Sequence, residues 1–325
     1  MRKWIELIAA GALVYGATPA LAVEGGSGAY LLGTRDLLAG VVPPPGEYVN
    51  FDVIHIQGSV DKLPISGVAL TNAEIEAWIA KAGATFVSPK KLMGGRAALN
   101  VQVPFASVNM DFSGVLGGLI AGTLSDAKIG MADPTVTPML GWDSGAWHWN
   151  VSMPVYVPIG YYDTATIKLG RPPDVSVVSL GKNKWAFDPT FAWTWLDPKI
   201  GFEFSGAVGL TLSTMNEATD YQTAPELHVE LTAGQHFRNG AALGLTGYYY
   251  QQTGNDTGSG AEKIQKVLDI DSLQARVFGI GPVLNWNTEI GTIPVILEAK
   301  YLHELGAKRR FESDIIWGSV TFAFR

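Results

Sequence analysis

Apolar and polar residues alternate in Ile200-Gly-Phe-Glu-Phe-Ser-Gly-Ala-Val-Gly-Leu-Thr-Leu-Ser213. One parity carries Phe202, Phe204, Val208, Leu210 and Leu212, and the other carries Glu203, Ser205, Ala207, Thr211 and Ser213. A period of two predicts a β-strand with one apolar and one polar face. Similar segments, separated by turn signals, continue from about Lys184 to the end of the chain. This pattern is typical of a β-sandwich or of a transmembrane β-barrel.

The beginning of the chain distinguishes these two architectures. Residues 1–22 contain Arg2 and Lys3, then an apolar run, then the small-residue site Ala20-Leu-Ala22. This order predicts a secretory signal peptide that is cleaved after Ala22. Because the apolar run is too short to cross a bilayer, a membrane anchor is not expected. An exported chain of two-faced strands indicates a barrel in a bacterial outer membrane.

The composition excludes several other classes. The 325 residues include no cysteine and carry a net charge of −7, and nucleic-acid binding requires a basic surface instead. No later stretch offers the ~20 consecutive apolar residues of a membrane-spanning helix. No glycine-rich phosphate loop is present, and His228 and His236 would lie about 26 Å apart on one strand. The sequence therefore predicts no cofactor, no metal site and no nucleic-acid partner.

Eleven strands can be assigned from the alternation. They are 47–60, 95–104, 127–142, 146–160, 184–197, 200–213, 226–237, 241–253, 274–287, 292–304 and 314–325. Bacterial single-chain barrels have even strand numbers, so a twelfth strand is expected, and we place it at 105–112 after a tight turn. The prediction is an all-β, closed antiparallel transmembrane barrel over residues 47–325, with twelve strands, or alternatively fourteen. Long loops would be extracellular and short turns periplasmic.

Two segments fall outside this barrel pattern. Residues 23–46 include Pro43-Pro-Pro45 and cannot join a ladder, so we expect an N-terminal segment in the periplasm or the lumen. Residues 71–82 have the composition and capping signals of an amphipathic helix, which is expected within the first long loop, 61–91.

The polar parity of the strands predicts the side chains that face the lumen, because a charge facing lipid costs ~2–4 kcal/mol. The candidates are His148, Asn150, Tyr156, Asp188, Glu203, His228, Glu230, His236, Tyr248, Tyr250, Glu298 and Lys300. They suggest either a charge network that fills and stiffens a narrow barrel, which we favour, or the lining of a permeation path. Tyr248 and Tyr250 suggest a surface for aromatic solutes or part of an interfacial aromatic belt.

Catalysis has little support in the sequence. His148, Asn150 and Ser152 share one strand face, but alternate residues lie ~6–7 Å apart, too far for a catalytic triad within one strand. No Gly-x-Ser-x-Gly element is present. We therefore expect a protein that is not an enzyme.

Five pieces of sequence, in order, resemble a known family. They are Leu37-Leu-Ala-Gly-Val-Val-Pro-Pro-Pro-Gly-Glu-Tyr48, Asn100-Val-Gln-Val-Pro104, Ala218-Thr-Asp-Tyr-Gln-Thr223, Gly247-Tyr-Tyr-Tyr-Gln-Gln252 and Gly258-Ser-Gly-Ala261. Together they resemble the outer-membrane phenol meta-pathway (MetA-type) degradation-like proteins. The resemblance implies a barrel found near aromatic-degradation pathways that admits hydrophobic substrates, and it implies no catalytic residues.

The combined expectation is a channel for passive uptake of small hydrophobic, especially aromatic, compounds. A general or ion-selective porin and a plugged barrel acting through its surface loops are the alternatives. The expected partners are outer-membrane lipid and lipopolysaccharide, hydrophobic solutes, and the insertion machinery that reads the C-terminal strand. That strand ends Phe324-Arg325, whereas such strands usually finish on an aromatic residue.

Overall fold

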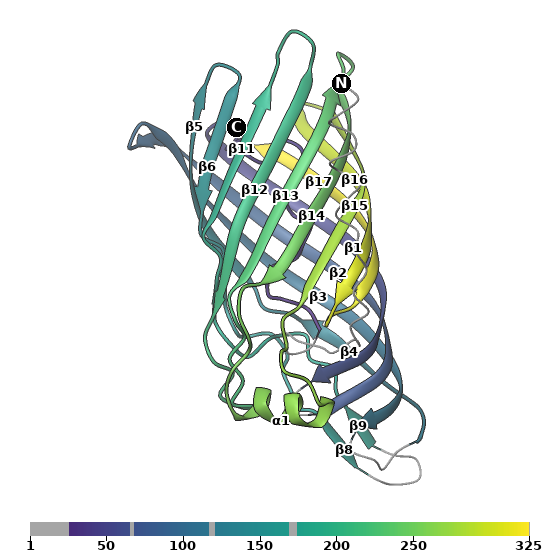
Figure 1. Ribbon diagram of the computed structural model, residues 1–325. Coiled ribbons are helices and arrows are strands. Elements are labelled where there is room, and N and C mark those ends of the chain that lie inside the picture. The colour runs from purple at the N-terminus through teal and green to yellow at the C-terminus, as the bar shows by residue number, and fades with distance from the viewer. Residues whose placement is uncertain (1–25, 66–67, 117–120, 169–173, 325) are drawn as a thin grey trace, which may run out of the picture.

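The computed structural model describes residues 26–65, 68–116, 121–168 and 174–324. The expected signal peptide, residues 1–22, and Arg325 lie outside the described residues. One sheet dominates the molecule and curls into a tall barrel (Figure 1).

The barrel wall has twelve strands. Nine are single strands, and three are each made of two consecutive segments, β4 with β5, β6 with β7, and β10 with β11. Their bounds are β1 (Gly46–Ile65), β2 (Val68–Leu92), β3 (Gly95–Leu116), β4 (Ala121–Met131), β5 (Thr135–Ser144), β6 (Trp147–Ser152), β7 (Val155–Tyr156), β10 (Ala186–Phe187), β11 (Thr190–Leu196), β12 (Phe202–Ser213), β13 (Glu226–His236), β14 (Ala241–Gln252), β15 (Arg276–Ile290), β16 (Ile293–Lys308) and β17 (Glu312–Phe324). The antiparallel pairing of β1 with β17 closes the sheet. The predicted closed antiparallel barrel of twelve strands is confirmed.

Prolines account for the three interruptions. Pro134, Pro154 and Pro189 fall between the two segments of their respective strands. A proline has no N–H to donate to a ladder, so the regular pairing stops there. Backbone hydrogen bonds still connect adjacent strands at the interruptions. For example, the amide of Asp188 donates to the Pro154 carbonyl at 2.9 Å.

The expected helix at 71–82 is wrong, because these residues belong to β2. They pair in continuous register with β1 on one side and β3 on the other. Alanine, glutamate and lysine favour helices locally, but pairing on both edges overrides that preference. Asn72, with a φ of 46°, interrupts the alternation just before Ala73, and this irregularity hid the period of two.

The placement of the twelfth strand at 105–112 is also wrong. Residues 95–116 form one strand, β3, and β2 supplies the strand that the count required. The strand continues through Pro104. The nitrogen of this proline, which has no N–H to donate, faces the gap between β4 and β5. On that side Gln102 pairs with Thr135 and Phe105 pairs with Met131, so no ladder bond is lost at the proline.

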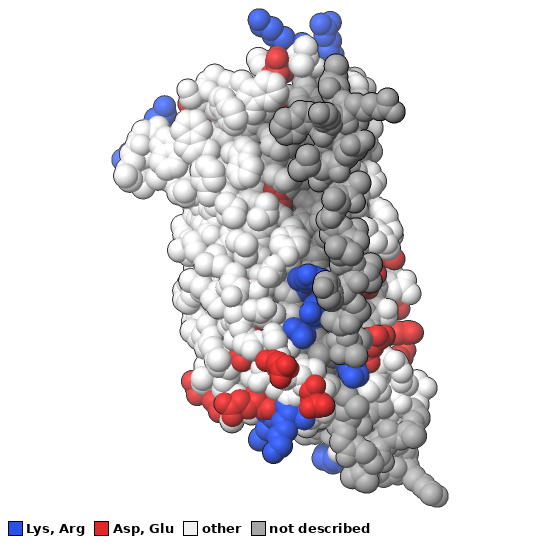
Figure 2. All heavy atoms as spheres, in the orientation of Figure 1, with Lys and Arg blue, Asp and Glu red and all other residues white. Residues whose placement is uncertain are grey.

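The two faces of the wall follow the predicted parities. Exposed apolar side chains cover the outside, among them Phe51, Val53, Phe105, Val151, Phe191, Phe204, Leu231, Leu243, Leu245, Leu284, Trp286 and Ile316. In Figure 2 the middle of the visible wall is almost uncharged, whereas charged side chains gather near the lower end and a few project at the upper end. No helix among the described residues is long and apolar enough to cross a membrane.

The two ends of the barrel differ. The turn end carries short connections at 93–94, 145–146, 197–201, 237–240 and 291–292. The loop end carries the long connections, the small sheet of β8 (Thr166–Lys168) and β9 (Asp174–Ser176), and α1 (Ser259–Leu268) (Figure 1).

Helix α1 lies in the segment 254–273, between the predicted strands 241–253 and 274–287. Ala261, Ile264 and Leu268 are buried, at a helical spacing that the sequence already contained. Asp220 accepts a hydrogen bond from the Ser259 amide at 3.0 Å, at the start of the helix. Hydrogen bonds from Ser259 hold the pKa of Asp220 below its ordinary value, so acidification through that pKa would weaken this attachment.

Candidate functional site

Residues 26–45, here called the lumen segment, lie inside the barrel. At the loop end, Lys182 Nζ donates to the Ser27 carbonyl at 2.8 Å. At the turn end, Val42 packs in a buried cluster with Val87 and Ala98 of β2 and β3. The segment therefore runs most of the length of the lumen before the chain enters β1.

A single carboxylate on β13 holds the middle of the lumen segment. Glu230 accepts hydrogen bonds from the amides of Gly33 at 2.7 Å and Arg35 at 2.6 Å, and from the Tyr30 hydroxyl at 3.2 Å. The carboxylate is buried, and hydrogen bonds to charged groups contribute about 1.5–3 kcal/mol each. Glu230 is therefore a principal anchor of the segment.

A second anchor lies closer to the turn end. Glu203 accepts from the Leu38 amide, and Thr194 Oγ1 accepts from the Gly40 amide at 2.9 Å. Asn150 Nδ2 donates to the Ala39 carbonyl at 2.9 Å. These bonds satisfy backbone groups that would otherwise be buried without partners.

A lysine on β16 provides the third anchor. Lys300 Nζ donates to the Gly33 carbonyl at 2.7 Å and pairs with the carboxylate of Asp36. It also lies 3.3 Å from Glu298 and 4.1 Å from the centre of the Trp317 ring. On the same indole, Lys81 lies 4.2 Å from the ring centre.

An aromatic contact fixes the start of the segment. The rings of Tyr30 and His228 stack with centroids 3.8 Å apart and an interplanar angle of 15°. His228 Nε2 in turn lies 3.0 Å from a carboxylate oxygen of Asp188. These buried groups form a packed network, not an open lining.

Gly40 is a sensitive position of the lumen segment. A Cβ added there would lie 2.5 Å from the His148 carbonyl oxygen and 2.5 Å from the Trp193 carbonyl carbon, both backbone atoms of the wall. We predict that Gly40→Ala destabilises the seated segment by about 1–3 kcal/mol, because the wall backbone cannot yield. Limited proteolysis of the folded protein measures this as faster cleavage within 26–45.

Gly318→Ala is the matched control for that experiment. A Cβ at Gly318 meets no described atom within 4 Å, so cleavage of the lumen segment should stay at the wild-type rate. Equal rates for the two variants would contradict the close approach at Gly40.

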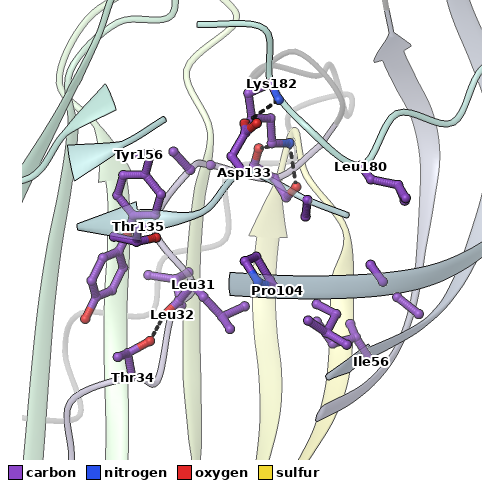
Figure 3. A pocket seen from close by; sticks show the side chains of 18 of the residues that line it. Leu31, Leu32, Thr34, Ile56, Pro104, Asp133, Thr135, Tyr156, Leu180 and Lys182 are labelled. Atoms are coloured by element: carbon purple, nitrogen blue, oxygen red, sulfur yellow. Dashed lines mark hydrogen bonds between the residues drawn. The ribbon is translucent and has the colours of Figure 1, made fainter. Parts of the chain in front are cut away.

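Beside the lumen segment the barrel retains a cavity of about 490 Å³, here called the lumen cavity. Residues from 26 to 35 line one side, and inward side chains of β1, β2, β3, β5, β16 and β17 line much of the rest. Residues 178–182 and Phe311 border it at the loop end. In Figure 3, Leu31 and Leu32 of the segment lie with Tyr156, Thr135 and Pro104 around this space.

The lumen cavity changes polarity along its length. Toward the loop end its lining is mostly apolar and includes Leu31, Ile56, Ile75, Ile79, Val108, Met110, Leu180, Phe311 and Ile315, together with the charged side chains of Lys182, Glu304 and Arg310. Toward the turn end it is lined by Lys81, Thr85, Asn100, Gln102, Thr135 and Thr137. A solute that enters at the loop end meets apolar side chains and a few charged ones first, and mainly hydrogen-bonding groups further in.

The structure places the predicted lumen residues on the inner face. Buried are Asn150, Asp188, Glu203, His228, Glu230, Tyr248, Tyr250 and Lys300, and partly exposed are His148, Tyr156, His236 and Glu298. Of these twelve, Tyr156 alone borders the lumen cavity among the described residues. Most of the others hold the lumen segment or contact the residues that do.

Tyr248 and Tyr250 do not line the lumen cavity. Their hydroxyls donate to Glu304 at 2.7 Å and to Glu226 at 2.5 Å. Arg310 lies 4.9 Å from the centre of the Tyr250 ring and pairs with Glu304 at 3.1 Å. The two rings therefore belong to the packed, charged side of the lumen.

Several residues of the site were not predicted from the sequence. They are Tyr30, Arg35, Asp36 and Gly40 on the lumen segment, and Asp52, Lys81 and Trp317 on the wall. The signal for Lys81 was its period-two spacing with Ile79 and Ala77, which the helix assignment obscured. The segment residues have no periodicity that could have revealed their partners.

Comparison with known families then identifies the chain. The sequence profile described as "Putative MetA-pathway of phenol degradation" matches residues 64–320. The protein belongs to this family. The resemblance seen in the sequence is thereby confirmed, whereas no curated protein is detectably similar in sequence.

A solved structure shares the fold. The crystal structure of the COG4313 outer membrane channel from Pseudomonas putida F1 aligns with a TM-score of 0.65 and 13% identity, covering 87% of this chain and 97% of that one. The β domain of the Bordetella autotransporter BrkA aligns with a TM-score of 0.48 and 11% identity, covering 86% and 99%. The likeness shows the fold, which is that of a barrel found in bacterial outer membranes. Short turns of such barrels face the periplasm, which assigns the turn end to that side.

Proposed function

We propose that the protein is a channel for the passive uptake of small hydrophobic, chiefly aromatic, compounds. The observation that carries the proposal is the lumen cavity, which the lumen segment leaves open along β1, β2, β3 and β5 with a mostly apolar lining at the extracellular end. The family's description, which names phenol degradation, supports aromatic compounds as the cargo.

The size and lining of the cavity suit such molecules. Ligand pockets typically measure ~300–1,000 Å³ and are mostly apolar with a few polar groups. An engineered apolar cavity of ~150 Å³ already accommodates benzene, so a volume of about 490 Å³ leaves space for a single-ring compound to move.

The lining gives no support to catalysis. None of the described residues around the lumen cavity is a histidine. His228, the most deeply buried histidine of the described chain, is committed to Tyr30 and Asp188.

The signal peptide, with cleavage after Ala22, and recognition of the C-terminal strand by the insertion machinery remain part of the proposal. Both accord with an outer-membrane barrel whose last strand, β17, pairs with β16 and β1.

The proposal is tested by flux into vesicles whose outer leaflet contains lipopolysaccharide. Toluene and phenol are compared with arabinose and with potassium ions, with and without the purified protein. We expect the protein to accelerate entry of the aromatics and to leave entry of the sugar nearly unchanged.

Two outcomes would contradict the proposal. Equal acceleration of arabinose and potassium would favour a general porin. No acceleration of any solute would favour a plugged barrel that acts through its loops.

A further inference from the structure

The charged residues that border the lumen cavity are unbalanced. Among the described lining residues five are cationic, namely Arg35, Lys81, Lys182, Lys184 and Arg310, and two are anionic, namely Asp133 and Glu304. The whole chain carries a net charge of −7. The cavity is therefore a cationic space within an acidic protein.

Two of these cations are paired with carboxylates. Lys81 lies 3.2 Å from Asp52, and Arg310 lies 3.1 Å from Glu304. Each pair leaves little net attraction for a passing solute.

Arg35 differs from those cations. The one hydrogen bond of its side chain to a described residue runs from Nη2 to Ser152 Oγ at 3.0 Å. No described carboxylate lies within ion-pair distance of its guanidinium, so Nε and Nη1 keep donors available. A guanidinium binds carboxylate-like groups through two parallel hydrogen bonds.

Neutral hydrogen-bonding groups surround the same part of the cavity. Arg35 is joined through Ser152 to the β6–β7 wall, and Thr135, which pairs with Tyr156, lies on the adjoining strand. Thr135, Thr137 and Tyr156 all border the cavity. Most of the apolar residues of the lining lie further toward the loop end.

From this arrangement we infer that the lumen cavity selects amphipathic aromatic anions, with Arg35 as the residue that binds the acidic group. The ring of such a solute contacts the apolar lining near Ile56, Ile79 and Met110, and its oxygens accept from the free edge of the guanidinium. The inference rests on the proposed function, because it specifies which aromatic compounds the channel prefers.

The anchoring of the lumen segment separates this role from a structural one. Arg35 is held by its backbone amide, which donates to Glu230 at 2.6 Å. Replacing the side chain leaves that bond in place, so Arg35→Gln removes the charge without releasing the segment.

The test compares benzenesulfonate with benzenesulfonamide, two probes of similar size of which only the first is an anion at pH 7. Their fluxes are measured in proteoliposomes for the wild type, Arg35→Gln and Arg35→Lys. We expect Arg35→Gln to lower sulfonate flux about tenfold, since a hydrogen bond to a charged group is lost. Sulfonamide flux should change less than twofold, and Arg35→Lys should retain most of the sulfonate flux.

Arg238→Gln is the matched control, because it removes the same charge from an exposed position in the short turn 237–240. Its sulfonate flux should equal that of the wild type. Heat-dependent migration on gels verifies that each variant is a folded barrel.

Distinct results overturn the two claims. The role of Arg35 is overturned if Arg35→Gln lowers the fluxes of benzenesulfonate and benzenesulfonamide equally. It is also overturned if the variant lowers neither flux. Failure of benzenesulfonamide to pass the wild type overturns the proposed function, whereas the sulfonate-to-sulfonamide ratio reports on Arg35.

Discussion

Deletion of residues 26–45 should raise the single-channel conductance of the barrel several-fold. The lumen segment occupies the charged side of the lumen, held by Glu230, Glu203 and Lys300. A barrel of twelve strands without an internal plug encloses a continuous aqueous space. Conductance in planar bilayers measures the effect directly.

A second variant tests the same prediction if the protein that lacks residues 26–45 does not assemble. Glu230→Gln combined with Glu203→Gln removes two anchoring charges, and charge-assisted hydrogen bonds are about twice as strong as neutral ones. We expect brief, frequent openings to the conductance of the deletion variant. A conductance that stays at the wild-type level in both proteins would show that the segment does not limit the pore.

Ala77→Trp should abolish most of the accelerated entry of aromatic solutes. Ala77 is buried on the inner face of β2 and borders the lumen cavity beside Ile75 and Ile79. An indole there would fill much of the apolar part of the space, so flux of toluene should fall at least about tenfold, an effect of about 1.4 kcal/mol on the barrier.

Ala80→Trp is the matched control three residues further along the same strand. Ala80 is exposed on the outer face, where an aromatic side chain suits the contact with lipid. Its flux should equal that of the wild type. A similar loss in both variants would indicate a general defect of β2 in place of a blocked cavity.

Much of the wall could be predicted because strand parity is a local property. Leu243 and Leu245 lie outside, and Tyr248 and Tyr250 lie inside, as alternation in 241–253 indicated. A slip of one residue would reverse every face, so the apolar parity fixes the orientation of each strand.

The remaining features depend on contacts between distant residues. Gly33 and Glu230 are 197 positions apart, and Lys300 and Gly33 are 267 apart. The lumen segment has no repeat that could identify such partners, and the lumen cavity exists only where the segment and β1 to β5 do not touch. For β2, the prediction of a helix followed the local helix propensity of residues 71–82, because the irregularity at Asn72 had obscured the alternation of the strand.

The unequal lengths of the strands set how far the wall rises above the membrane. β2 has 25 residues, whereas β13 has 11. At ~3.3 Å per residue and a tilt of ~40°, β2 reaches a height of about 60 Å, against an apolar band of ~25 Å. The β1–β3 side therefore stands well into the saccharide zone of the outer leaflet. Under the proposed function, a solute would enter the barrel among the sugars, before it reaches the tightly packed acyl chains below.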